Sequence, residues 1–390
     1  MLDPELNFSR VPLLFQYSHY FYRFIMKNLV FTVTNDLTYD QRMIRICHSL
    51  AMAGFGICLI GRKLKDSPPL GQQSFKQKRL NCFFTKGKLF YLEFNFRLFV
   101  FLLFRRMDCI CAIDLDTILP CYLVSRLRGI QRVYDAHELF CEMQEIVERP
   151  VIYKTWKWLE KKTVPKFQYG YTVNQPIAEE FRQMYGVNYE VIRNASVLQP
   201  LVIPDKKQKY ILYQGSVNKG RSFETLIPAM KLVNAPLIIC GDGNFLDQAK
   251  KLVAGHGLEK KIFFKGKLDP ETLRSYTVNA WVGVTLFENH GLSNYFSLAN
   301  RFFDYLHAGI PQVCVNYPVY HDLNNNRPFA VLIDDLAPDT IASAINSLFD
   351  DEQLYHSLQE NCLLVRQQLN WQQEEKKLIS FYNQIMNKVG

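Results

Sequence analysis

The sequence predicts an α/β protein with two doubly wound, Rossmann-like domains that face a cleft, followed by C-terminal helices. Short apolar strands alternate with amphipathic helices along most of the 390 residues. This alternation is typical of βαβ units around a parallel sheet. A charged KKQK stretch at 206–209 interrupts the pattern, which then restarts. The length is sufficient for two or three domains with complete cores.

The first predicted domain covers residues 27–200. Its opening strand, 27–34, precedes a helix at 38–54 in which Met43, Cys47 and Leu50 share one face and a glycine provides the stop. The other strands are predicted at 56–62, 89–94, 109–114, 131–137, 167–174 and 189–194, and further helices at 97–106 and 119–129. We interpret residues 1–26, which precede the first clear strand, as an N-terminal extension.

The second predicted domain covers residues 201–369, and residues 370–390 are predicted to form a C-terminal helix. Six apolar segments read as strands of a second parallel sheet: 209–215, 236–243, 261–266, 280–287, 311–316 and 329–334. A cleft between two such domains, at the carboxyl ends of the strands, is the expected ligand site.

The composition is that of an ordinary globular protein, with 48% hydrophobic and 21% charged residues. No apolar run approaches the roughly 20 residues that span a bilayer, and we see no export signal near the N-terminus. The ten cysteines are scattered, without a C-x-x-C pair, which favours free thiols in a reducing cytoplasm over a zinc site or a catalytic cysteine. We therefore expect a cytoplasmic protein.

Positive charge is concentrated in residues 62–106, which hold eleven basic and two acidic residues together with nine phenylalanines. This combination suits an anionic membrane surface. A core strand and helix with solvated lysines is the plain alternative, and single-stranded nucleic acid is a third. We expect peripheral contact with the inner face of the membrane through this segment, and no nucleic acid.

Two motifs place candidate functional residues at the ends of predicted strands. In VYDAHELF (133–140), His137 follows a strand and lies between Asp135 and Glu138, which makes it a candidate catalytic residue. In YQGSVNKGRSFETLI (213–227), a strand leads through a glycine-bearing loop to a helix. Gly215 lets a ligand approach the backbone closely, and the cations at 219 and 221 suit a diphosphate at a helix N-terminus. These cations are Lys219 and Arg221.

The stretch YFSLANRFFDYLHAGIP (295–311) carries a polar row that is predicted to share one helical face. The row consists of Ser297, Asn300, Arg301, Asp304 and His307. We expect Ser297 to cap the helix, Arg301 to bind phosphate and Asp304 to accept hydrogen bonds from ribose hydroxyls. A solvated surface is the alternative.

Two other motifs are weaker. CGDGNFLDQ (240–248) begins like a dinucleotide fingerprint, but Leu246 stands at the third glycine position, so we interpret it as a tight strand-to-helix turn and disfavour an NAD enzyme. AIDLDTILP (112–120) contains a D-x-D pair, Asp114 and Asp116, of the kind that binds metals, but nothing near it in the sequence supports a metal. We interpret them as a strand end followed by a helix start.

Taken together, these motifs resemble those of the family 4 (group 1) glycosyltransferases, enzymes of the GT-B fold that are generally retaining and metal-independent. The resemblance extends over roughly residues 27–385 and also includes NDLTYDQRMIRI (35–46). It implies transfer of a hexose-like sugar from a nucleotide-sugar donor to a lipid-linked or polysaccharide acceptor, without a cofactor.

The resemblance also implies roles for individual residues. His137 matches the histidine near the reacting centre, and Asp304 matches the acid that holds the ribose. The diphosphate loop is matched by Gly215, Lys219 and Arg221. Residues 297–301, SLANR, resemble the S-x-P-x-K variant of the family, with Ala299 in place of proline and Arg301 in place of lysine. Asn35 and Asp36 are expected in the first loop, facing the cleft.

The chain departs from the family pattern at one position. The common pattern has two acids eight positions apart, and the residue eight before Asp304 is Phe296. The candidates for contacting the transferred sugar instead are Glu288, Asn289 and Asn294, and Glu138, beside His137, is expected to face the cleft. Because the first acid is missing, a catalytically silent GT-B subunit that binds a nucleotide or partner remains an alternative, as does a GT-B phosphorylase or epimerase.

Overall fold

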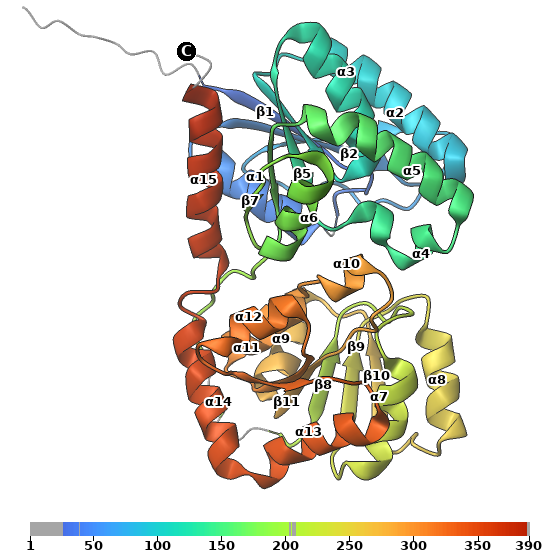
Figure 1. Cartoon of the computed structure of the whole chain (residues 1–390), viewed down its shortest axis with the longest axis vertical. Helices are drawn as coiled ribbons and strands as arrows, with labels where there is room; N and C mark the ends of the chain where they lie inside the picture. The colour runs from blue at the N-terminus through green and yellow to red at the C-terminus, as the bar shows by residue number, and fades with distance from the viewer. Residues whose placement is uncertain (1–25, 39, 203, 205–207, 388–390) are drawn as a thin grey trace, which may run out of the picture.

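The computed structural model describes residues 26–38, 40–202, 204 and 208–387, and shows two α/β units, one above the other (Figure 1). Each is built on a parallel sheet with helices on both faces, which confirms the predicted fold class. The predicted extension at 1–26 lies, except for Met26, outside the described residues.

The first sheet has seven strands in the order β3-β2-β1-β4-β5-β6-β7. Its strands are β1 (Asn28–Thr32), β2 (Gly56–Lys63), β3 (Lys76–Asn81), β4 (Cys109–Ile113), β5 (Gln131–Ala136), β6 (Tyr169–Thr172) and β7 (Glu190–Val191). The accompanying helices are α1 (Gln41–Met52), α2 (Gly87–Leu103), α3 (Ile118–Arg128), α4 (Gln144–Val147), α5 (Pro150–Thr163) and α6 (Gln175–Tyr185).

The second sheet has six strands in the order β10-β9-β8-β11-β12-β13. Its strands are β8 (Ile211–Gln214), β9 (Leu237–Cys240), β10 (Ile262–Gly266), β11 (Val282–Thr285), β12 (Gln312–Val315) and β13 (Ala330–Ile333). The helices are α7 (Phe223–Ala229), α8 (Leu246–Gly255), α9 (Pro270–Asn279), α10 (Leu292–Tyr295), α11 (Asn300–Ala308), α12 (Pro318–Asn325), α13 (Pro338–Asp350), α14 (Glu352–Val365) and α15 (Trp371–Asn387).

The last helix returns to the first sheet. Side chains of α15, among them Leu378 and Tyr382, complete the apolar cluster that β1 and α1 form on one face of that sheet. The return begins at Trp371, whose backbone N donates to Ser196 O at 2.9 Å and whose indole Nε1 donates to Ser49 Oγ at 2.9 Å. Helix α15 thus covers the first sheet although it follows the second domain in sequence (Figure 1).

One predicted strand is wrong. Residues 89–94 are not a strand but the first turns of α2, which runs to Leu103. The helix buries Phe90 and Phe94 and leaves Leu92 and Phe96 exposed, so it is apolar on nearly all sides and its helical period is hidden in the sequence. The missed neighbour is the polar edge strand β3, whose residues alternate in exposure. No described helix is long and apolar enough to cross a bilayer.

The strand order sets where a ligand can bind. In the first sheet the order reverses between β1 and β4, and in the second between β8 and β11. At such reversals the connections leave toward opposite faces and open a crevice at the carboxyl ends of the strands. The loops that follow β1, β4 and β5 line the same cavity as those that follow β8 and β11.

Candidate active site

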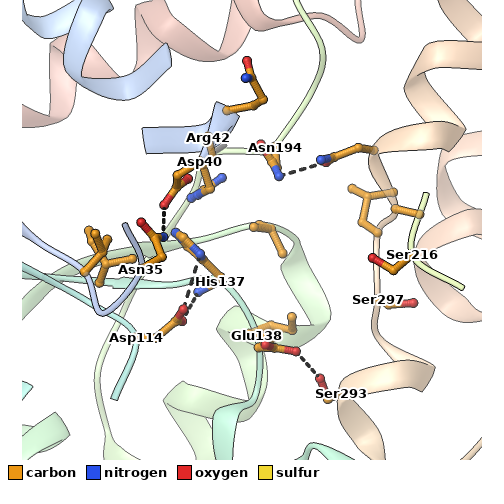
Figure 2. Close-up of a pocket in the computed structure, with 18 of the residues that line it drawn as sticks. Asn35, Asp40, Arg42, Asp114, His137, Glu138, Asn194, Ser216, Ser293 and Ser297 are labelled. Atoms are coloured by element: carbon orange, nitrogen blue, oxygen red, sulfur yellow. Dashed lines mark hydrogen bonds and ion pairs between the residues drawn. The ribbon is translucent and has the colours of Figure 1, made fainter. Parts of the chain in front are cut away.

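A cavity of about 560 Å³ lies between the two domains. Its wall on the first domain includes Thr34, Asn35, Asp40, Arg42, Asp114, Asp116, His137, Glu138 and Asn194, and its wall on the second includes Ser216, Arg221, Phe287, Ser293, Ser297, Asn300 and Arg301. Figure 2 shows His137 and Glu138 of the first domain on one side of the cavity, and Ser216 and Ser297 of the second domain on the other. Seven of the sequence-predicted site residues line it: Asn35, Glu138, His137, Arg221, Ser297, Asn300 and Arg301.

His137 is held between two carboxylates at the end of β5. Its Nε2 lies 3.2 Å from Asp135 Oδ2, and its Nδ1 lies 3.4 Å from Asp114 Oδ2. Its backbone N also donates to Asp114 Oδ1 at 3.0 Å. Burial opposes the charged imidazolium, but Asp114 and Asp135 outweigh it and raise the pKa of His137 to about 9. The ring is therefore a cation at neutral pH and not a free base.

An ion pair that the sequence analysis missed lies behind the histidine. Arg42 Nη2 donates to Asp135 Oδ1 at 2.8 Å, and both side chains are almost fully buried. Burial would raise the pKa of Asp135, but Arg42 and His137 together hold it below its usual value. Arg42 comes from α1 and lies within the stretch 35–46 that carries part of the resemblance, but it was given no site role. It fixes Asp135, which in turn orients the imidazole.

The acids of the D-x-D stretch follow β4, as interpreted from the sequence, and they also line the cavity. Thr34 Oγ1 donates to Asp116 Oδ2 at 2.5 Å. Burial raises the pKa of both Asp114 and Asp116 to about 6. Their position at strand ends was the signal that could have identified them as cavity residues, since ligands bind at the carboxyl ends of parallel strands.

Two arginines dominate the opposite wall. The Arg221 guanidinium carbon lies 4.3 Å from the centroid of the Phe287 ring, and that of Arg301 lies 4.8 Å from the same centroid. Arg221 Nη1 donates to Asn294 Oδ1 at 3.2 Å, and Arg301 Nη2 donates to Leu286 O at 3.3 Å. Within the described ranges, neither forms an ion pair with a carboxylate. Burial and Arg301 lower the pKa of Arg221.

The predicted helix cap at Ser297 is wrong. Helix α11 begins at Asn300, after Ala299, and no side chain caps it. The chain first closes a turn in which Ser297 N donates to Asn294 O at 3.1 Å, and Ala299 N then donates to Tyr320 Oη at 3.1 Å. The tyrosine hydroxyl thus takes one backbone N–H before the helix starts. Ser297 lines the cavity without being part of α11.

Asp304 does not line the main cavity. It lines a second cavity of about 330 Å³, which Asn300 also lines. Its oxygens accept hydrogen bonds from Ser196 Oγ at 2.5 Å and from Gln214 Nε2 at 2.8 Å. Burial raises the pKa of Asp304, although these hydrogen bonds oppose it. His307 shares the second cavity, and its Nε2 lies 2.7 Å from Leu369 O. Burial lowers the pKa of His307 to about 4, so this ring is neutral and braces the start of the final segment.

The residues of the glycine-bearing loop after β8 do not all line the main cavity. Lys219 is exposed, pairs with Glu148 of the first domain at 3.5 Å and lines a third cavity of about 330 Å³ with Asn294, rather than the main one. Gly215 has a φ of 118°, and its carbonyl oxygen lies 1.8 Å from where a Cβ on Gly241 would stand. A side chain at 241 cannot fit there, which gives that glycine a packing role.

Two predicted cleft residues brace loops. Asp36 accepts from Ser67 Oγ at 3.0 Å and does not line the cavity. Glu288 pairs with His290 at 3.0 Å and lines none of the three cavities described above. Asn35, in contrast, lines the main cavity and donates to Asp40 Oδ2 at 2.6 Å.

Sequence comparison relates the second domain to a known family. Residues 201–363 match the family model described as Glycosyl transferases group 1. An uncharacterised glycosyltransferase of Methanocaldococcus jannaschii is 24% identical over 190 residues, which are 47% of this chain and 47% of that protein. The matched region is therefore about half the length of this curated relative.

The whole fold is similar to that of several solved structures. Sucrose-phosphate synthase from Thermosynechococcus elongatus superposes with a TM-score of 0.77 and 16% identity, covering 93% of this chain and 100% of that one. HepE of Anabaena in complex with UDP-glucose superposes with a TM-score of 0.71 and 11% identity, covering 92% and 99%. The protein therefore has the two-domain GT-B fold, and its match to the group 1 glycosyltransferases lies in the second domain.

Proposed function

We propose that the protein is a glycosyltransferase that moves a hexose-like sugar from a nucleotide-sugar donor to a polysaccharide or lipid-linked acceptor. One observation carries the proposal: Arg221 and Arg301 face the interdomain cavity without a carboxylate partner among the described residues. Unpaired cations in a partly buried site are costly, and a diphosphate would neutralise them. The match of residues 201–363 to group 1 glycosyltransferases supports the same reading.

The donor would occupy both cavities. Its diphosphate would lie against Arg221 and Arg301, and its nucleoside would enter the cavity that contains Asp304 and Gln214. A carboxylate has about four acceptor positions, so Asp304 can accept a ribose hydroxyl in addition to its two protein donors. Asn300 lines both cavities and would lie near the junction of nucleoside and diphosphate.

In the transfer step, the bond between the sugar C1 and the diphosphate oxygen breaks, and both electrons leave with the diphosphate. The acceptor hydroxyl oxygen bonds to C1, and its proton passes to the leaving diphosphate. The arginines would stabilise the charge that develops on the leaving group without a metal ion. The positively charged His137, whose ring nitrogens face Asp114 and Asp135, would act near the reacting centre through its charge.

The proposal is tested by a panel of UDP, GDP and their sugar conjugates. We expect one nucleotide to raise the Tm of the protein, and the matching nucleotide sugar to be consumed when an acceptor is supplied. A flat thermal response to the whole panel would contradict the donor site. Nucleotide binding without transfer, in extracts that contain acceptors, would favour the silent GT-B subunit, and release of a sugar phosphate with inorganic phosphate would favour a phosphorylase.

Retention of anomeric configuration and independence from metal are proposals that follow the family resemblance. Proton NMR of the first-formed product gives the anomeric configuration, and an inverted product would contradict the first. Transfer that stops in excess EDTA and recovers with Mg²⁺ or Mn²⁺ would contradict the second.

A lipid-linked acceptor calls for a membrane-proximal enzyme, and α2 and α3 present a suitable surface. We call it the α2–α3 face; it consists of Leu89, Leu92, Phe96, Val100, Phe104, Leu119, Leu123 and Leu127, all exposed. The two helices pack side by side (Figure 1). The cations near their ends include Lys86, Lys88, Arg106 and Arg126, which are also exposed. Apolar ridges rimmed by cations suit anionic lipid, so we propose peripheral attachment to the inner face of the membrane.

The α2–α3 face differs from the membrane-contact segment 62–106 that the sequence predicts. It gains the three leucines of α3 and loses Arg79, whose Nε donates to Asp36 O at 2.6 Å and whose Nη2 donates to Thr38 Oγ1 at 2.9 Å. Arg79 braces the loop after β1 and is unsuitable as a lipid-binding probe.

Vesicle co-sedimentation tests the α2–α3 face. We expect binding to phosphatidylglycerol–phosphatidylcholine vesicles that weakens with salt and is lost in the double variant Leu92→Ser, Phe96→Ser. Leu364→Ser is the matched control, since Leu364 is exposed on α14 of the second domain. Equal binding of the double variant and wild type would contradict the membrane contact.

A further inference from the structure

We infer that Glu138 hydrogen-bonds the hydroxyl groups of the transferred sugar and so supplies, from the first domain, the carboxylate that the second domain lacks at Phe296. The inference rests on the proposed function and concerns which residue distinguishes a nucleotide sugar from the bare nucleotide. It depends on three features: the position of Phe296, the position of Glu138, and the engagement of the other polar candidates.

Phe296 is used for contact between the domains. It follows α10 directly, and its ring packs against the apolar core of the first domain. Its backbone carbonyl accepts a hydrogen bond from Asn174 Nδ2 at 2.7 Å, and Asn174 belongs to the first domain. The second domain thus sends an aromatic side chain across the interface at the position where a sugar-binding acid is common in the resembling family.

Glu138 of the first domain contacts the second domain in turn. It follows β5, and its Oε2 accepts a hydrogen bond from Ser293 Oγ of α10 at 2.9 Å (Figure 2). Ser293 lies three residues before Phe296, so the carboxylate reaches the same short segment from the other side. Glu138 and Arg221 both line the main cavity and the third cavity. A sugar attached to a diphosphate at Arg221 would lie within reach of this carboxylate.

Glu138 also retains a free acceptor. Only its Oε2 takes part in a hydrogen bond to the described residues, which leaves Oε1 for a sugar hydroxyl. Of the candidates named from the sequence, Glu288 pairs with His290 outside the three cavities, and Asn294 Oδ1 accepts a hydrogen bond from Arg221. Asp114 is bound by His137.

The test compares the affinities of UDP and UDP-glucose, and of GDP and GDP-mannose, by calorimetry. Burial raises the pKa of Glu138 to about 7, so the binding is measured at about pH 8, where its carboxyl is ionised. For the pair that binds wild type, we expect Glu138→Gln to raise the Kd of the nucleotide sugar about tenfold or more, the range for a lost hydrogen bond to a charged group. The Kd of the bare nucleotide should stay within about twofold, because the nucleotide contacts the second domain. Glu288→Gln is the matched control and should leave both Kd values unchanged.

The outcomes separate this inference from the proposed function. If wild type binds neither nucleotide, the proposed function fails and the inference fails with it. If wild type binds but Glu138→Gln weakens sugar and bare nucleotide equally, Glu138 merely positions the diphosphate site, and the inference alone is overturned. An unchanged nucleotide-sugar Kd overturns it as well. Far-UV circular dichroism checks that the variant is folded, and Glu138→Ala should show the same selective loss.

Discussion

The two walls of the interdomain cavity treat charge in opposite ways. On the first domain, the cations His137 and Arg42 pair with the carboxylates Asp114 and Asp135. On the second, Arg221 and Arg301 stack on Phe287 and meet no carboxylate in the described part of the chain. The first wall thus pairs its cations within the protein, whereas the second leaves two cations that the proposed diphosphate would neutralise.

The largest expected effect is a loss of stability when a charged residue of the first-domain wall is replaced. Arg42→Met removes one partner of a buried ion pair and leaves Asp135 with His137 as its remaining cationic partner, so we expect the free energy of unfolding to fall by about 3 kcal/mol. Urea denaturation measures it. Arg182→Met is the control, because its pair with Glu179 is exposed and removing it should cause no resolvable change. Similar destabilisation by both variants would show that the buried network has no special weight.

Arg301→Met should weaken nucleotide binding without destabilising the fold. Losing a buried cation without a carboxylate partner should leave the unfolding free energy unchanged or raise it. The affinity for the nucleotide that binds wild type should fall about 10- to 100-fold, as expected for charge-assisted hydrogen bonds to phosphate. Calorimetry with UDP or GDP measures the affinity and denaturation measures the stability. A variant that is destabilised yet keeps its nucleotide affinity would reverse the assignment of the two walls.

His137 gives a pH-dependent test of the first wall. Its pKa is raised from 6.5 to about 9, so its charge stabilises the folded state fully below about pH 6.5 and ceases to do so as pH rises through 9. We expect the difference in unfolding free energy between wild type and His137→Gln to shrink between pH 7 and about 10. NMR of the imidazole nitrogens gives the titration directly, and a midpoint near 6.5 would mean that the two carboxylates do not hold the ring.

Lys219→Met should have the smallest effect. The lysine is exposed, and its partner is Glu148 rather than a residue of the main cavity. We expect the nucleotide Kd to change by about twofold or less. A loss as large as that of Arg301→Met would mean that the loop moves Lys219 onto the diphosphate when the donor binds.

The sequence allowed the fold and part of the site to be predicted for one physical reason. Parallel strands are short apolar runs, and the residues that follow them lie at one edge of the sheet. His137 and Glu138 after β5, and Ser216 after β8, obey this rule. The acids after β4 obey it too, although we gave them no site role. The rule needs no information beyond the position of the strands.

What could not be predicted depends on contacts between distant parts of the chain. Asp304 meets Ser196 across 108 residues, and Arg42 meets Asp135 across 93. Directly before α11, Ala299 N donates to the hydroxyl of Tyr320, which lies 21 residues further along the chain. Helix α2 was misread because its exposed face is as apolar as its buried face. Local patterns carry none of this information.

The return of α15 to the first domain has a consequence for synthesis on the ribosome. Domains generally fold as units while the chain emerges, with the N-terminal one first. Here the apolar face that β1 and α1 present stays uncovered until residues 371–387 have been made, after the second domain's core, which extends to Val365, has been synthesised. The domain that is translated first is thus finished last, and a truncation within α15 would damage the fold at the opposite end of the chain.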